Sequence, residues 1–233
     1  MRFSLELLVD ILYLLFVAVL GGVMVKKSAG NKQYLLFGTM AIALSIGDTC
    51  LLVPKLIVLT DATSQSWTVI ADVGQQIALI AITLFYVLLY YVWRNRYKIR
   101  EKKGITETVW TLAIFRMILS FFLILLYILP NEWINGVSLP RAWERYLSIP
   151  FLIMGLLIVI LFNKSAKEND DRPFRWLWLM IGINLICYIL IDMLVQSIPL
   201  MIVLMILLMG MYILLLMTGY HAMEVQIRNE KKG

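Results

Sequence analysis

The chain has 233 residues, of which 61% are hydrophobic and 15% charged, and its formal net charge is +6. Soluble domains are typically about 45–50% apolar and about 25% charged, so this composition excludes an ordinary soluble fold and indicates a membrane protein. The basic excess lies in short segments between apolar runs, where it suits the anionic membrane surface, and it does not predict nucleic-acid binding.

Seven apolar runs predict seven membrane-spanning helices, because a span needs about 20 mostly apolar residues. In chain order we expect them at about 4–25, 34–59, 68–93, 106–129, 146–163, 175–197 and 200–221. No remaining stretch is long and polar enough for a second, soluble domain. The sequence therefore predicts an all-α, polytopic membrane protein with one seven-helix transmembrane domain over residues 1–233.

The first run could be mistaken for a cleaved signal peptide. It carries Glu6 and Asp10 at its start and Lys26 and Lys27 after its end. A cleaved signal has its positive charge in front of the apolar run, so we expect a retained helix.

The distribution of Lys and Arg predicts the orientation. The loops after the first, third and fifth helices, together with the C-terminal tail, hold 16 of the 21 basic residues, and the opposite side holds 3. Basic residues are enriched in cytoplasmic loops. We therefore expect the N-terminus outside and the C-terminus in the cytoplasm.

Five ionisable residues lie well inside the expected spans: Asp48, Lys55, Asp72, Arg116 and Asp192. Such groups are costly in lipid, usually face the protein interior and often mark functional sites. From their depths, Lys55 and Asp72 are expected to pair near the outer surface, and Asp48 is expected to lie within reach of Arg116. Asp192 has no obvious partner except Lys55.

Other polar residues share helix faces with these charges. Gln76 and Thr83 follow Asp72 on the third helix, and Tyr188 precedes Asp192 by four residues on the sixth. Residues three or four apart lie on one face of a helix. The pattern predicts a water-accessible cavity between the second, third, fourth and sixth helices, lined by the five charges, Gln76 and Tyr188. Buried ion pairs or polar contacts that serve only helix packing are the alternative.

Several kinds of chemistry are disfavoured by composition. His221 is the only histidine and lies at the end of the last span, and the two cysteines fall in separate spans. A zinc site needs three or four convergent ligands, so we expect no metal and no cofactor. A retinal Schiff base would need a lysine in the last helix, which has none.

These observations favour a small-molecule carrier or ligand-binding membrane protein over an enzyme. Lys55 and Arg116 would hold an anionic or zwitterionic ligand, and Asp48 or Asp192 would exchange a proton. The first alternative is a membrane lipid hydrolase in which Asp48 and Asp192 act as acid and base, because burial raises carboxyl pKa values. A structural or accessory subunit is the second alternative, and the oligomeric state stays open.

Four stretches resemble a family of uncharacterised bacterial seven-helix membrane proteins. They are GDTCLLVPK (47–55), FYVLLYYVWRNRY (85–97), LPNEW (129–133) and IPFLIMGLLIVILF (149–162). The resemblance implies a seven-helix fold in a bacterial cytoplasmic membrane and no assigned activity. Its second-helix motif usually has His where this chain has Leu51, and its last helix usually has Pro-Lys where this chain has Leu207 and Leu208.

Two weaker likenesses bear on the alternatives. SIGDTCLL (45–52) resembles the Ser-x-x-Gly-Asp-x-x-Leu stretch of lysoplasmalogenases, except that Ser45 is one residue closer to Gly47. The first three and last three helices would share one orientation around an inverting fourth helix, an arrangement similar to that of the SWEET sugar carriers.

Overall fold

The computed structural model describes residues 2–28, 30–60, 66–99, 103–129, 142–193 and 198–230. Its elements are α1 (Arg2–Lys27), α2 (Lys32–Thr60), α3 (Ser66–Arg96), α4 (Lys103–Ile128), α5 (Ala142–Glu168), the short 3-10 helix η2 (Arg172–Phe174), α6 (Leu177–Met193) and α7 (Ile198–Glu230). Seven of these helices are long and apolar enough to cross a membrane. The predicted all-α fold is confirmed, and its seven long apolar helices support a multi-pass helical bundle.

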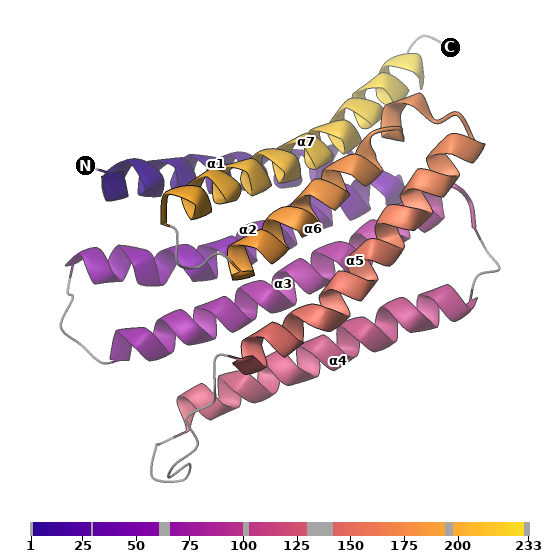
Figure 1. Cartoon of the computed structure of the whole chain (residues 1–233). Coiled ribbons are helices and arrows are strands. Elements are labelled where there is room, and N and C mark those ends of the chain that lie inside the picture. The colour runs from indigo at the N-terminus through magenta and orange to yellow at the C-terminus, as the bar shows by residue number, and fades with distance from the viewer. Residues whose placement is uncertain are drawn as a thin grey trace.

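Each helix packs against the next one in the chain, from α1 to α7 (Figure 1). The bundle closes where α7 contacts α1 and α2, and α3 also contacts α5. Because the number of spans is odd, the two termini lie at opposite ends of the bundle (Figure 1). In this arrangement α3 has neighbours on several sides, so side chains that project from α3, α5 and α7 can meet in the interior.

The last helix is longer than its sequence predicted. We expected it to end at residue 221, and α7 continues to Glu230. Its extra turns are held by tertiary contacts: Met223 is fully buried, and the Tyr34 hydroxyl donates to the Ala222 carbonyl at 3.3 Å and contacts Gln226. Hydropathy locates only the apolar part of a helix, whereas packing against α2 stabilises the polar turns of α7 that follow its apolar part.

The outer face of the bundle is apolar, as a lipid-facing surface must be. On α4, Phe115, Ile118 and Phe122 are all more than half exposed. The opposite face of the same helix buries Val109, Ala113, Arg116, Ser120 and Leu123 at helical spacing. The charge on α4 is therefore directed to the interior and not to lipid.

Small residues bring α2 and α3 close together. A β-carbon added at Gly47 would lie 2.5 Å from the Ala81 side chain, and one added at Gly74 would collide with the Cys50 backbone carbonyl. Such small-residue interfaces let membrane helices approach closely. This contact fixes the position of Asp48, which follows Gly47 directly in α2.

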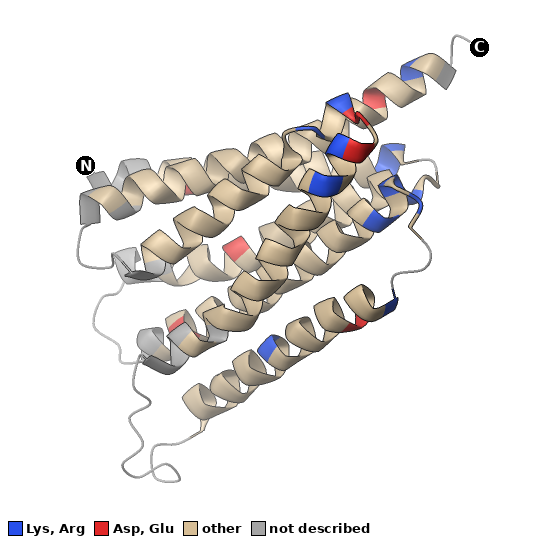
Figure 2. Cartoon of the chain, turned by 45° about the vertical axis from the view of Figure 1, so that its right-hand side comes forward, with Lys and Arg blue, Asp and Glu red and all other residues tan. Residues whose placement is uncertain are grey.

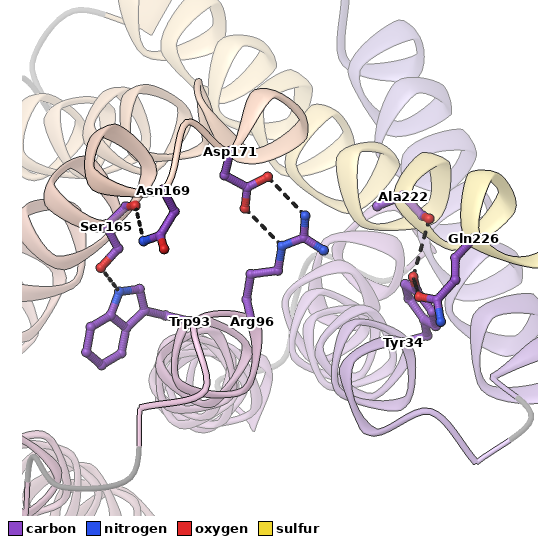
Figure 3. A network of polar contacts seen from close by, with 8 residues as sticks. All are labelled: Tyr34, Trp93, Arg96, Ser165, Asn169, Asp171, Ala222 and Gln226. Carbon is purple, nitrogen blue, oxygen red and sulfur yellow. Dashed lines mark hydrogen bonds and ion pairs between the residues drawn. The ribbon is translucent and has the colours of Figure 1, made fainter. Parts of the chain in front are cut away.

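Most basic residues lie at one end of the bundle, where α1, α3 and α5 end and α2, α4 and α6 begin (Figure 2). We call it the basic end. Arg96 forms a two-point ion pair there, with Nε and Nη2 each 2.9 Å from an Asp171 carboxylate oxygen. Trp93 Nε1 donates to the Leu161 carbonyl at 3.1 Å. It also donates to Ser165 Oγ at 3.0 Å (Figure 3). These contacts join α3 to α5 and to the segment before α6.

Candidate functional site

Arg116 lies near the middle of α4 and is buried. Its side chain is 1% exposed, and its position is about 20 Å along the helix from Lys103 and about 18 Å from Ile128. A cation at this depth is expensive unless protein groups or a ligand solvate it. The surroundings of Arg116 therefore define the candidate site.

Two helices supply the immediate contacts of Arg116. Its Nη2 donates to the Tyr188 hydroxyl of α6 at 3.1 Å. Its guanidinium carbon lies 4.2 Å from the centre of the Phe151 ring on α5 and 5.9 Å from that of the Tyr188 ring. A cation over an aromatic face is attracted by the ring quadrupole, more strongly where water is absent. The rings compensate for part of the lost hydration of the guanidinium, but they do not neutralise its positive charge.

Aromatic contacts hold this arrangement in position. The Phe151 ring packs 5.0 Å from Tyr188 and 4.7 Å, edge to face, from Tyr86 of α3. The Tyr188 hydroxyl also hydrogen-bonds Ser148 Oγ of α5 at 3.2 Å. We call Tyr86, Arg116, Ser148, Phe151 and Tyr188 the Arg116 cluster. Four helices contribute to it, so its geometry depends on the whole fold.

Several hydrogen-bonding atoms in and next to the Arg116 cluster have no partner among the described residues. Among the described residues, Arg116 Nε and Nη1 have no hydrogen-bond partner, and neither has Ser120 Oγ one turn away on α4. No ion pair to Arg116 occurs in this part of the chain. Guanidinium presents a fork of donors that matches carboxylate and phosphate geometry. Two of its three nitrogens are therefore available to an anionic group.

A second polar centre lies on the other side of the bundle interior. The Asp48 carboxylate of α2 is hydrogen-bonded by the Tyr13 hydroxyl of α1. Tyr212 of α7 lies close enough to interact electrostatically with both Asp48 and Arg116. Tyr212 thus interacts with both the acid and the base, and all seven helices contribute side chains to these two centres.

The expected contact between Asp48 and Arg116 is not formed. Arg116 makes its hydrogen bond to Tyr188, while Asp48 binds Tyr13. Tyr86 and Tyr212 lie close enough to Arg116 to interact with it electrostatically, and Tyr212 also interacts with Asp48. Depth along a helix predicted the level of each residue in the bundle but not which partners its side chain would find.

The other predicted site residues are placed less completely. Gln76 of α3 is fully buried, and both atoms of its amide lack partners among the described residues. Asp72 is half-buried one turn before Gln76 and does interact with other groups. The side chains of Lys55 and Asp192 lie outside the described part of the structure, so their pairing with Asp72 or with each other stays a prediction.

The basic end has pockets, lined for example by Arg96, Asp171 and Arg172 and by Lys32, Arg94 and Lys98. Beside Arg116 lie the rings of Phe151 and Tyr188, and the expected water-accessible cavity between the second, third, fourth and sixth helices stays a prediction. The described residues contain no group of three His, Cys, Asp or Glu side chains placed to hold a metal ion.

Sequence reasoning missed several residues near the two charges. Ser148, Phe151 and Tyr212 near Arg116, and Tyr13 beside Asp48, lie in apolar runs and were not among the predicted site residues. Tyrosine inside a span is a usable signal, since its hydroxyl needs a partner when it is buried. Phe151 carries no such signal and can be found only from the packing of α5 on α4.

Comparison with known proteins adds no identification. No family model, curated protein or solved structure matches the chain. The fold and the Arg116 cluster define the class, a bundle of seven helices long and apolar enough to cross a membrane, with a buried cation. The resemblance to the uncharacterised bacterial family stays a prediction.

Proposed function

We propose that the protein is a membrane carrier or ligand-binding protein whose ligand presents an anionic group to Arg116. The observation that carries this proposal is a buried guanidinium with two nitrogens that have no partner among the described residues. The ligand would be a small carboxylate, phosphate or zwitterion, because those groups accept two parallel hydrogen bonds from one guanidinium.

Energetics favours a ligand over a purely structural role. Helix packing alone could be served by Ser, Thr or apolar contacts, without the desolvation of a full charge. A hydrogen bond to Tyr188 and contact with Phe151 offset only part of that cost. An anion beside Nε and Nη1 would neutralise the charge and would add two charge-assisted hydrogen bonds.

The Asp48–Tyr13 pair supports a proton-coupled version of the same function. A carboxylate inside a membrane bundle is a candidate proton carrier, and Tyr212 connects it electrostatically to Arg116. Asp48 or Asp192 would take up a proton as the anion binds, so that the net charge moved through the membrane stays small. We further propose that the basic end faces the cytoplasm of a bacterial cell.

The first test is ligand binding to the purified full chain in a non-ionic detergent. Acetate, lactate, succinate, inorganic phosphate and glycine betaine are added singly, and melting temperature is recorded for wild type, Arg116→Lys and Arg116→Met. A ligand that stabilises wild type at a hundredfold excess over its Kd should contribute about 2.7 kcal/mol. The shift should shrink in Arg116→Lys, which keeps the charge but loses the fork, and vanish in Arg116→Met.

Reconstitution in sealed vesicles then separates the function classes. A carrier should accumulate the stabilising anion when a proton gradient is imposed, and Asp48→Asn should abolish the dependence on that gradient. Lipid turnover in detergent, without any gradient, would instead favour a hydrolase that uses Asp48 and Asp192. If no probe shifts wild type and a second protein copurifies in fixed ratio, the chain is an accessory subunit and the proposal fails.

A further inference from the structure

We propose that the ligand of the Arg116 cluster carries a neutral hydrogen-bonding group, a hydroxyl or a carboxamide, which binds between Gln76 of α3 and Ser120 of α4. This inference rests on the proposed function and adds the far end of the ligand to its anionic end. Both side chains are fully buried, and the Gln76 amide and the Ser120 hydroxyl have no partner among the described residues. The ligand class is therefore an organic acid with a distal hydroxyl or amide group.

Gln76 lies on the face of α3 that is turned toward α4. Gly74 and Ala81 lie on the opposite face, since both positions are in close contact with α2. In an α-helix, Gln76 is about 160° around the axis from Gly74 and about 140° from Ala81. Tyr90 is within about 40° of Gln76 on the same axis, and it hydrogen-bonds Thr106 of α4 at 2.7 Å. The Gln76 side chain therefore leaves α3 on the side of α4.

Gln76 and Ser120 also lie at the same level of the bundle. The helices α3 and α4 pack against each other in opposite directions (Figure 1), and the contact between Tyr90 and Thr106 fixes their register. Gln76 comes 14 residues before Tyr90, and Ser120 comes 14 residues after Thr106. Each is therefore about 21 Å from that contact, in the same direction along the bundle. The register brings the two unpartnered side chains to the same part of the α3–α4 interface.

Ser120 connects this polar pair to the Arg116 cluster. It follows Arg116 by four residues on the buried face of α4, which places it about 6 Å further from the basic end. Arg116 Nε and Nη1 have no hydrogen-bond partner among the described residues. A ligand whose anionic group binds Arg116 would therefore meet a second set of unpartnered donors and acceptors about 6 Å or more from that group.

The second set of polar atoms is neutral and contains both donors and acceptors. The Gln76 amide offers an NH₂ donor and a carbonyl acceptor, and the Ser120 hydroxyl can donate or accept. A hydroxyl or carboxamide on the ligand can pair with both kinds of atom, whereas a methyl group would leave them buried without partners. Asp72 lies one turn before Gln76 and already interacts with another group. The neutral amide therefore decides which group the ligand presents here.

The test compares acids of nearly equal length, added to the purified full chain in a non-ionic detergent. Hexanoate, 5-hydroxypentanoate and 5-aminopentanoate differ only in their terminal methyl, hydroxyl or ammonium group. Affinities are taken from the concentration dependence of the melting temperature. Wild type should bind 5-hydroxypentanoate about tenfold more tightly than hexanoate, because only the hydroxyl pairs with the buried polar atoms. The ammonium acid should bind no better than hexanoate.

Substitutions assign this preference to named side chains. Gln76→Leu should remove the preference for the hydroxyl and leave the hexanoate affinity unchanged, and the ligand-free variant should be at least as stable as wild type. Thr83→Val is the matched control, because Thr83 is also fully buried on α3 but its hydroxyl already donates to the Leu79 carbonyl at 2.6 Å. It should keep the wild-type preference. Ser120→Ala should weaken the preference about threefold, and it preserves the test if Gln76→Leu fails to fold.

Failure of this inference differs from failure of the proposed function. If neither these acids nor the anions of the first test stabilise wild type through Arg116, the proposed function fails, and this inference fails with it. If anions bind through Arg116 but 5-hydroxypentanoate binds no better than hexanoate, only the inference about the far end fails, and Gln76 and Ser120 serve helix packing. Tighter binding of 5-aminopentanoate, or an equal loss of the preference in Thr83→Val, would overturn it as well.

Discussion

Arg116 of α4 donates from Nη2 to the Tyr188 hydroxyl of α6 at 3.1 Å, and Phe151 of α5 lies against the guanidinium with a 4.2 Å separation. Three helices thus meet around one positive charge in the interior of the bundle. The relationship is asymmetric, since Tyr188 has Ser148 as a second partner while two nitrogens of Arg116 have none among the described residues. Changes at the two positions should therefore have different consequences.

Arg116→Met should leave the melting temperature of the ligand-free protein unchanged or raise it. Methionine fills a similar volume and removes the desolvation penalty, and replacement of buried charges by apolar groups is often neutral or stabilising by about 1–4 kcal/mol. Melting in detergent, followed by tryptophan fluorescence, measures the effect. A drop of several degrees would mean that Arg116 holds the bundle together, and the ligand interpretation would lose its basis.

Tyr188→Phe should destabilise the protein by about 1–3 kcal/mol. The change removes the acceptor of Arg116 and leaves that donor buried without a partner. The same change in an Arg116→Met background should cost less, because the stranded donor is then absent. This double-mutant cycle measures the interaction energy between Arg116 and Tyr188. Purely additive effects of the two changes would contradict a direct contact between the two side chains.

The ion pair at the basic end provides a prediction about stability alone. Asp171→Asn should cost about 1.5–3 kcal/mol, since it replaces two charge-assisted hydrogen bonds from Arg96 at a residue whose side chain is only 7% exposed. Glu168→Gln is the matched control, because its pair with Lys164 is exposed and 3.9 Å long and should be worth under about 0.5 kcal/mol. Thermal melting of both variants checks the prediction, and equal effects would refute it.

The sequence predicted the framework of this protein better than its interior. Apolar length alone located all seven helices, because lipid leaves a span no other way to satisfy its backbone. It also placed Arg116 and Tyr188 in one predicted site; the structure brings these two side chains into contact, and their role as a site stays a prediction. It did not predict the contact of Phe151 with the guanidinium, because that prediction requires knowing which face of α5 is turned toward α4. In a helix that is apolar on all faces, the sequence periodicity does not indicate that face.

The α2–α3 interface yields a prediction that depends only on packing. Gly74→Ala should destabilise the protein by about 1–3 kcal/mol or more, because its new β-carbon would meet the backbone carbonyl of Cys50, which cannot rotate away. Gly182→Ala in α6 is the control: nothing lies within 4 Å of the position that its β-carbon would take. Alanine is the better helix former by about 0.8–1.0 kcal/mol, so the control should be neutral or stabilising. Melting temperatures that moved together would show that α2 and α3 are not in backbone contact at Gly74. Because Asp48 lies in the same stretch of α2, a real loss at Gly74 should also weaken any proton-dependent uptake, whereas Gly182→Ala should leave uptake unchanged.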